Sequence, residues 1–264
     1  MLLSDLQISK QEVRDIFDGQ ASYYSRERGQ SPWFHAQLKI AFDMLASEQG
    51  LLLALGCAAG AEVEPLRARG FRVVGIDYSP EMIRLAQQRF GGLEGVCFCR
   101  ADAESLPFPA GSFDQVVCLG LFEYLSTYER CLEEISRVLR PGGVAIISVP
   151  TRISLDRLSV GFFNYTLIPL WKGLKRLMGK PAAGKSFGRS WNSCFPWQFP
   201  RLLRKYGLRF EGRAYSGFIL FPLGALWPAL EYRLFVFMER FSKSRVLGWM
   251  LSQYMVCARK TASF

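Results

Sequence analysis

Short apolar runs alternate with helix-length amphipathic segments along the first 150 residues of the chain. Each apolar run predicts a strand buried on both faces of a sheet, and each amphipathic segment predicts a helix that covers it. The predicted strands are residues 51–55, 72–76, 96–100, 113–119 and 144–149, and the predicted helices are residues 61–69, 80–90 and 128–138. This alternation predicts an α/β fold with a mostly parallel sheet and helices on both faces.

The flanking segments extend this plan at both ends. A helical, aromatic stretch over residues 13–45, broken at Ser31-Pro32, predicts an N-terminal helical lid within residues 1–50. Residues 51–150 form the predicted core, and residues 151–195 form an aromatic and basic insertion after the fifth strand. Residues 196–264 complete the sheet with strands at 208–215 and 249–258, which makes seven strands, and with helices at 196–206 and 228–241.

Charge is distributed unevenly along the 264 residues, whose net charge is +10. Residues 1–150 carry 14 lysines and arginines against 19 acids, whereas residues 151–264 carry 19 against 4. A chain that is 50% hydrophobic can bury one large α/β core. We therefore expect a single domain whose C-terminal part is strongly basic and attracts an anionic ligand or surface.

The cysteines and the histidine limit the chemistry. Seven cysteines form an odd set, with Cys97 and Cys99 the only close neighbours, so we expect reduced thiols and a cytoplasmic protein. His35 is the only histidine, which leaves too few ligands for a metal site. No secretory signal is visible, and the apolar stretch at residues 218–230 holds 13 residues and two prolines, where a membrane span needs about 20 residues.

Residues 51–77 read as one strand–turn–helix–strand unit that predicts a nucleotide-binding corner. The turn Gly56-Cys57-Ala58-Ala59-Gly60 is built from small residues, which allow a ligand to lie against bare backbone. The following helix offers free N–H groups, and Asp77, at the end of the second strand, can accept hydrogen bonds from both hydroxyls of a ribose. The chain is therefore expected to be Rossmann-like and to bind an adenosine-type cofactor.

The order of motifs resembles the class I S-adenosylmethionine-dependent methyltransferases that act on small molecules and lipids. The family's first turn reads approximately Asp-x-Gly-x-Gly-x-Gly, and Ala54, Gly56, Ala58 and Gly60 stand in those places. The resemblance covers residues 13–150, and less distinctly residues 196–258. It implies S-adenosylmethionine as the cofactor and S-adenosylhomocysteine as the product. The Gly-x-Gly-x-x-Gly spacing of dehydrogenases is absent.

The resemblance also assigns the cofactor contacts. Asp77 corresponds to the ribose-binding acid, Met82 to a residue that packs on adenine, and Asp102 to the acceptor of the adenine amine. A helix cap for Asp77, a core methionine for Met82 and a turn-forming aspartate for Asp102 are the structural alternatives. The remaining expected cofactor contacts are Gly56, Cys57, Ala58, Gly60, Tyr78, Ala103 and Leu119.

Ala54 departs from the family pattern, because an acid there commonly helps to hold the methionine amino group. Losing a charge-assisted hydrogen bond of this kind costs about 1.5 to 3 kcal/mol unless another group replaces it. Glu62 is a possible substitute, although a solvated helix residue is an equal alternative.

The candidate catalytic residues are Glu123, Tyr124 and His35. Glu123 and Tyr124 follow the fourth strand, where sites of parallel sheets form. Relatives often have Glu-His at this place, so Tyr124 removes a histidine base and leaves His35 as the only imidazole. Tyr23 and Tyr24 of the lid and Trp191 are the predicted substrate contacts.

The aromatic and basic residues 160–180 have three interpretations: contact with an anionic membrane surface, a cap over the substrate pocket, or nucleic-acid binding, which lacks an organised motif here. We expect a methyltransferase that modifies oxygen, nitrogen or carbon of a hydrophobic or lipid-like acceptor in lipid or natural-product biosynthesis. An anionic or carrier-linked acceptor in solution and a non-catalytic cofactor-binding scaffold are the alternatives. The protein is expected in the cytoplasm, with peripheral membrane contact as a further hypothesis, and the sequence does not indicate an oligomeric state.

Overall fold

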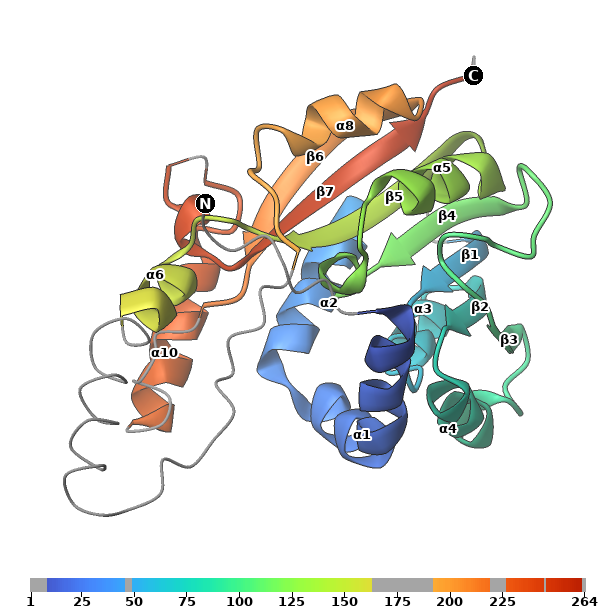
Figure 1. The fold of residues 1–264 in the computed structure, drawn as a ribbon, viewed down its shortest axis with the longest axis horizontal. Helices are drawn as coiled ribbons and strands as arrows, with labels where there is room; N and C mark the ends of the chain where they lie inside the picture. Colours follow the sequence, from blue (N-terminus) through green and yellow to red (C-terminus); the bar gives the residue numbers. More distant parts are fainter. Residues whose placement is uncertain (1–8, 46–48, 163–191, 219–226, 245, 263–264) are drawn as a thin grey trace.

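The computed structural model describes residues 9–45, 49–162, 192–218, 227–244 and 246–262 (Figure 1). They form one seven-stranded sheet with the strand order β3-β2-β1-β4-β5-β7-β6. The strands are β1 (Gly50–Leu55), β2 (Phe71–Asp77), β3 (Val96–Arg100), β4 (Phe113–Cys118), β5 (Leu139–Pro150), β6 (Leu208–Ser216) and β7 (Gln253–Lys260). Only β7 is antiparallel to its neighbours, so the predicted mostly parallel, Rossmann-like sheet is confirmed.

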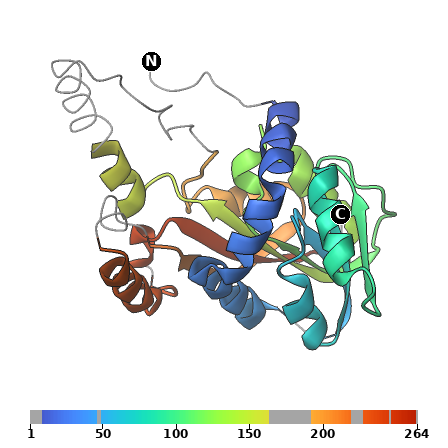
Figure 2. The same cartoon turned by 90° about the horizontal axis from the view of Figure 1, so that it is seen from below.

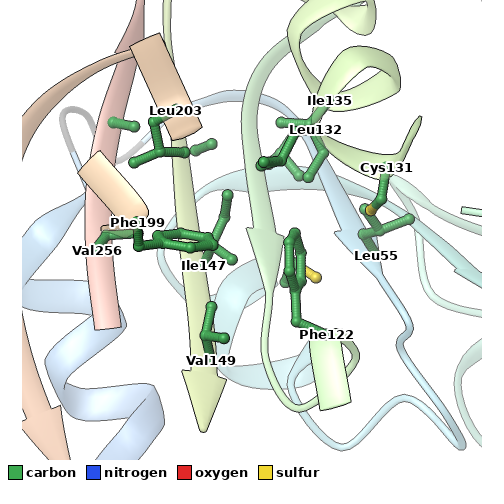
Figure 3. Packing of buried hydrophobic residues seen from close by; sticks show 14 of the residues in the cluster. Leu55, Phe122, Cys131, Leu132, Ile135, Ile147, Val149, Phe199, Leu203 and Val256 are labelled. Carbon is green, nitrogen blue, oxygen red and sulfur yellow. The ribbon is translucent and has the colours of Figure 1, made fainter. Parts of the chain in front are cut away.

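Helices cover both faces of the sheet, as the alternating pattern requires. On one face, α5 (Glu129–Val138) and α8 (Phe199–Lys205) bury apolar side chains against β4, β5 and β7. Figure 3 shows Leu132 and Ile135 of α5 and Phe199 of α8 pointing into this layer, toward Ile147 of β5. The opposite face is covered by α2 (Pro32–Met44), α3 (Val63–Ala68) and α4 (Pro80–Phe90).

The lid predicted before the sheet consists of two helices. The first, α1 (Lys10–Gln30), begins at a capping box in which Ser9 and Glu12 satisfy each other's backbone N–H groups. Ser31 and Pro32 end it and start α2, as the sequence predicts. Figure 2 shows α1 extending along one side of the body, and its main partner is α4.

Two further helices lie at one end of the molecule, away from the middle of the sheet. They are α6 (Leu155–Phe162), which follows β5, and α10 (Pro228–Glu239), which precedes β7 (Figures 1 and 2). The short helices η1 (Phe122–Tyr124) and η3 (Gly248–Met250) follow β4 and precede β7. No helix in the described part of the chain is long and apolar enough to cross a membrane.

Three predicted boundaries differ from the structure. The helix expected at residues 61–69 begins at Val63, because residues 57–62 complete the turn after β1. The strand expected at residues 144–149 begins at Leu139, because Leu139 already pairs with Phe113 of β4 before the register shifts at residues 140–143. The last strand begins at Gln253 instead of Trp249, because residues 248–250 form η3.

Candidate active site

The turn after β1 is held against the end of β2 by its backbone. The N–H groups of Gly56 and Cys57 both donate to the Ile76 carbonyl at 2.9 Å. Gly56 has φ +73°, and a Cβ there would lie 3.2 Å from Leu121 Cβ, so this place requires glycine. Ala58 is the one described non-glycine residue with a positive φ, at +46°, in the place where the family pattern has glycine.

The other small residues of the turn serve packing. Gly60 has φ +78°, and a Cβ there would lie 3.1 Å from the Phe90 ring. The Cys57 thiol is buried and lies against Gly75 of β2. The turn therefore presents Gly56 and Ala58 to a ligand, while Gly60 and Cys57 fix its shape.

Asp77 is positioned at the end of β2 by two backbone donors. Its Oδ2 accepts from Ala58 N and its Oδ1 from Ser79 N, both at 2.9 Å. Burial raises the pKa of Asp77 above its ordinary value, and these two N–H groups oppose the rise. The carboxylate is thus fixed beside the turn, with lone pairs left on both oxygens for a diol.

Asp102 lies after β3 and is already engaged by the lid. Its Oδ1 accepts from Glu104 N at 2.9 Å, which is the geometry of an Asx turn, and its Oδ2 lies 2.6 Å from Lys10 Nζ of α1. Lys10 also pairs with Glu104. The sequence analysis did not identify Lys10, because nothing in the residues around it marks this contact.

Three cavities follow one another along the carboxyl edge of the sheet. The first, of about 60 Å³, lies at Asp77, Tyr78, Asp102 and Ala103. The second, of about 70 Å³, lies beside it at Gly56, Ala58 and Asp77, under Phe17 and Arg28 of α1. The third, the outer cavity, is much larger, at about 640 Å³, and its walls come from α1, α2, β7 and the β4 loop. Its lining residues are Arg28, Gln30, Ser31, Pro32, Trp33, Phe34, Gln37, Gly120, Glu123 and Gln253.

Arg28 and Gly120 border both the second and the outer cavity, so the two spaces are neighbours there. Arg28 Nη2 donates to the Leu119 carbonyl at 3.0 Å, and its guanidinium lies 4.5 Å from the Phe34 ring centroid. A Cβ on Gly120 would lie 3.5 Å from Glu123 Oε1 and 3.6 Å from Arg28 Nη1. The junction thus brings together one cation and one carboxylate around a bare glycine.

Glu123 and Tyr124 of η1 face different spaces. Glu123 lines the outer cavity, and its Oε2 has no hydrogen-bond partner among the described residues. Burial raises the pKa of Glu123 to about 6. Tyr124 lines the two smaller cavities and contacts the Phe17 ring edge-on at 5.0 Å.

Glu62 is the buried acid nearest to the glycine turn in sequence. It is only 6% exposed, and its Oε2 has no partner within the described part of the chain. Burial raises the pKa of Glu62 to about 7, while the charge of Arg28 lowers it. Ala54 is fully buried at the end of β1 and supplies no polar group.

Several predicted residues lie apart from the cavities. The His35 ring is exposed on α2, where Nε2 lies 3.0 Å from the Gly29 carbonyl oxygen, and Tyr23 is exposed on α1. Met82 is fully buried with Ala58 and Ala59, behind the turn. Trp191 and the side chain of Tyr24 lie outside the described residues. The roles of these five residues stay predictions.

Lining residues that the sequence analysis missed are Arg28, Trp33 and Gln253. Arg28 lies in the last turn of α1 and Trp33 is an isolated tryptophan on α2, so the residues around them in the sequence do not indicate a binding site. The described residues hold no group of three or more potential metal ligands, and the cysteines are free thiols.

The residues present fit S-adenosylmethionine in kind. Gly56 leaves space where a Cβ would meet Leu121, Asp77 offers a fixed carboxylate to a diol, and Glu62 supplies a buried oxygen without a partner. A cofactor of this size needs a pocket of about 300 Å³ or more, so α1 must move for the two small cavities to accept it.

Comparisons with known proteins agree with this site. A family model described as a methyltransferase domain matches residues 53–147. A demethylmenaquinone methyltransferase of Thermus thermophilus is 41% identical over 104 residues, which cover 39% of this chain and 47% of that protein. One of Clavibacter sepedonicus is 33% identical over 56% of this chain and 61% of its own length. The chain thus spans about half the length of these relatives.

Solved structures share the whole fold at low identity. A methyltransferase in complex with the Trm112 activator of Haloferax volcanii is 20% identical, with a TM-score of 0.65 over 93% of this chain and 97% of that one. The [4+2]-cyclase SpnF is 18% identical, with a TM-score of 0.63 over 96% and 97%. The matched methyltransferase domain and this shared fold agree with the class I S-adenosylmethionine-dependent methyltransferases that the sequence resembles.

Proposed function

We propose that this protein transfers a methyl group from S-adenosylmethionine to a hydrophobic, hydroxyl-bearing aromatic acceptor held in the outer cavity. The observation that carries the proposal is the junction at Gly120 and Arg28, where the expected cofactor side adjoins a cavity of about 640 Å³. A cavity of this volume suits a small organic molecule.

The walls of the outer cavity indicate the chemistry of its ligand. Trp33 offers flat apolar surface for a ring, and Phe34 supports the Arg28 guanidinium beside it. Two of its lining residues, Glu123 and Gln253, each carry a buried side-chain oxygen, Oε2 and Oε1, that has no partner among the described residues and can accept a hydrogen bond. A ligand that satisfies them must donate, which favours a phenol or hydroquinone over a fully oxidised ring.

Methyl transfer from a sulfonium requires a nucleophile in line with the methyl group, and S-adenosylmethionine supplies that electrophilic methyl when bound. Trp33 orients the acceptor ring, and the small Gly120 lets it approach. Glu123, with a pKa of about 6, is ionised at neutral pH and takes the acceptor's hydroxyl proton. The guanidinium of Arg28 stabilises the negative charge left on the acceptor oxygen.

The names of the relatives support the same acceptor class. Several are demethylmenaquinone methyltransferases, and one from Staphylococcus epidermidis aligns over 79% of this chain and 87% of its own length at 25% identity. We propose an aromatic acceptor of quinone or hydroquinone type with a lipid-like tail, methylated on ring carbon or on oxygen. Contact with the cytoplasmic face of an anionic membrane is compatible with such an acceptor. Residues 160–180 first suggested this contact, and all of them after residue 162 lie outside the described part.

Two alternatives have specific support. An anionic or carrier-linked acceptor would be attracted by the 19 basic residues after residue 150. A protein that binds the cofactor without methyl transfer is consistent with Ala54, and the structural neighbour named as a cyclase has the same fold.

The test is to incubate the protein with labelled S-adenosylmethionine and a reduced or oxidised demethylated naphthoquinone. Label should enter the reduced ring, and Glu123→Gln should slow transfer by about a hundredfold or more. Glu129→Gln, an exposed acid on α5, is the matched control and should transfer at the wild-type rate. Calorimetry that finds no cofactor binding at millimolar concentration would reject the enzyme, and transfer only to charged soluble acceptors would favour the alternative substrate.

A further inference from the structure

Helix α10 is apolar on two sides, which is unusual for a helix on the outside of a domain. Its inner side buries Phe235 and Met238 in the main core. Its outer side exposes Leu230, Tyr232, Val236 and Phe237, with Phe237 50% exposed. A helix that is hydrophobic all round is normally covered on every side.

The apolar surface continues at both ends of the helix. Trp227, directly before α10, is 59% exposed, and the following turn exposes Val246, Leu247 and Trp249. We name these eight residues the α10 face: Trp227, Leu230, Tyr232, Val236, Phe237, Val246, Leu247 and Trp249. Only five other large apolar residues are exposed in the described parts of the chain, so this concentration is local.

Positive charges are interleaved with the apolar side chains of the α10 face. Arg233 and Arg240 are exposed at helical spacing from Leu230 and Phe237, and Lys243 is exposed just beyond the helix. Glu239 points inward instead, where its Oε1 accepts from Gly217 N at 2.9 Å. Long basic side chains can keep their charge at lipid headgroups while the apolar stems and rings enter the acyl boundary.

The α10 face is connected to the outer cavity. Glu239 binds the backbone of Gly217 and the hydroxyl of Ser216, at the end of β6. A Cβ on Gly217 would lie 3.6 Å from Trp33 Cε2, and Trp33 lines the outer cavity. The base of α10 is therefore fixed to the wall of the space assigned to the acceptor.

We propose that the α10 face docks on the surface of an anionic lipid bilayer, so that a lipid-tailed acceptor reaches the outer cavity without crossing water. Docking of this kind is peripheral: rings of tryptophan and phenylalanine enter the headgroup region, and arginines pair with anionic lipids. The proposal rests on the proposed function only for the identity of the acceptor.

Vesicle sedimentation of the full chain tests the proposal. The protein should sediment with mixed phosphatidylcholine–phosphatidylglycerol vesicles at about 0.1 M salt, and less with phosphatidylcholine alone. The double variant Val236→Glu/Phe237→Glu and the charge variant Arg233→Gln/Arg240→Gln should each lower the partition coefficient by about tenfold or more. Trp197→Ser, which removes an exposed tryptophan outside the α10 face, should bind like the wild type.

The outcomes distinguish this proposal from the proposed function. Cofactor affinity and transfer to a short-chain, water-soluble acceptor should be unchanged in both double variants. Vesicle binding that the two variants leave intact, or absent binding by the wild type, would overturn the docking. So would a concentration-dependent dimer that Val236→Glu/Phe237→Glu dissociates, because a second copy would then cover the face.

Discussion

Lys10 Nζ, at the start of the N-terminal helix, lies 2.6 Å from Oδ2 of Asp102, the residue expected to accept the adenine amine. Burial is the largest single influence on the pKa of Lys10 and lowers it. The hydrogen bonds to Asp102 and Glu104, together with their charges, outweigh burial, so the pKa is raised. The ammonium of Lys10 thus occupies the place that an exocyclic amine would take. The lid is therefore fastened to the carboxylate that the resemblance assigns to the cofactor.

Removing this contact is expected to favour the cofactor. A partly exposed ion pair contributes about 0.2 to 1 kcal/mol, so Lys10→Met should tighten S-adenosylmethionine binding by up to about fivefold. Calorimetry measures the change. Lys10→Arg keeps the charge and should bind like the wild type, and weaker binding by Lys10→Met would instead show that Lys10 helps to hold the nucleoside.

Glu62 should make stability depend on pH. Its pKa is about 7 in the folded protein, chiefly through burial, against an ordinary value of 4.5. The folded state therefore holds the proton more tightly, and the free energy of unfolding falls as pH rises from 4.5 to about 7, by roughly 3 kcal/mol in total. Glu62→Gln should remove this fall and raise the melting temperature above pH 7 by about 5 °C or more, with little change at pH 4.5.

The matched control for this measurement is Glu64→Gln, an exposed acid of α3, the helix that directly follows Glu62. Its melting temperature should follow the wild type at every pH. Equal pH profiles for wild type and Glu62→Gln would mean that water or a neighbouring cation compensates the buried charge.

Glu62 destabilises the folded protein at neutral pH, but it could bind the methionine amino group in place of the acid that is missing at Ala54. Glu62→Gln should then weaken S-adenosylmethionine binding by about tenfold or more, the value of one charge-assisted hydrogen bond. Methylthioadenosine lacks the amino-acid end and should bind both proteins equally. Adding Ala54→Asp to Glu62→Gln should restore the affinity, whereas a double variant as weak as the single one would exclude the substitution.

The sequence predicted the sheet well because each strand is set by its own apolar residues. The five strands up to β5 and the acid at the end of β2 follow from local pattern, and so does the break at Pro32. Boundaries failed where pairing reaches beyond the apolar run: Leu139 pairs with Phe113 of β4, so β5 begins before residues 140–143, which are not paired with β4.

The site was less predictable, because its outer half is built from long-range contacts. Arg28 and Trp33 reach it only through the packing of α1 and α2 on the sheet, and Gln253 arrives from the last strand. His35 was a candidate base because it is the only histidine in the sequence. Its exposed place on α2 depends on how the helix is oriented on the sheet, which the sequence around it does not indicate. Polar residues at strand ends, such as Asp77, could be predicted from the sequence. The lid residues that face them, such as Arg28 and Trp33, could not.

Gly120 tests whether the two spaces meet as proposed. Gly120→Ala would place a methyl 3.5 Å from Glu123 Oε1 at φ +73°, between the cofactor side and the outer cavity. Turnover should fall by up to about a hundredfold through misplacement of the acceptor, while cofactor affinity changes little. Gly142→Ala is the control. Gly142 also has a positive φ, +79°, but a Cβ there would meet no atom within 4 Å. Both variants should lower the free energy of unfolding by about 1 to 2 kcal/mol, and Gly142→Ala should keep full turnover.

Glu123 is the residue whose ionisation should limit the reaction in acid. Since burial raises its pKa to about 6 and a base acts only when deprotonated, kcat/KM should rise tenfold per pH unit below about 6 and level off above it. Glu123→Gln should lose this acidic limb together with most of the rate, and Glu123→Asp should keep the limb at a lower rate. His35→Gln should leave the profile unchanged. An acidic limb that disappears in His35→Gln and persists in Glu123→Gln would assign the proton transfer to the imidazole instead.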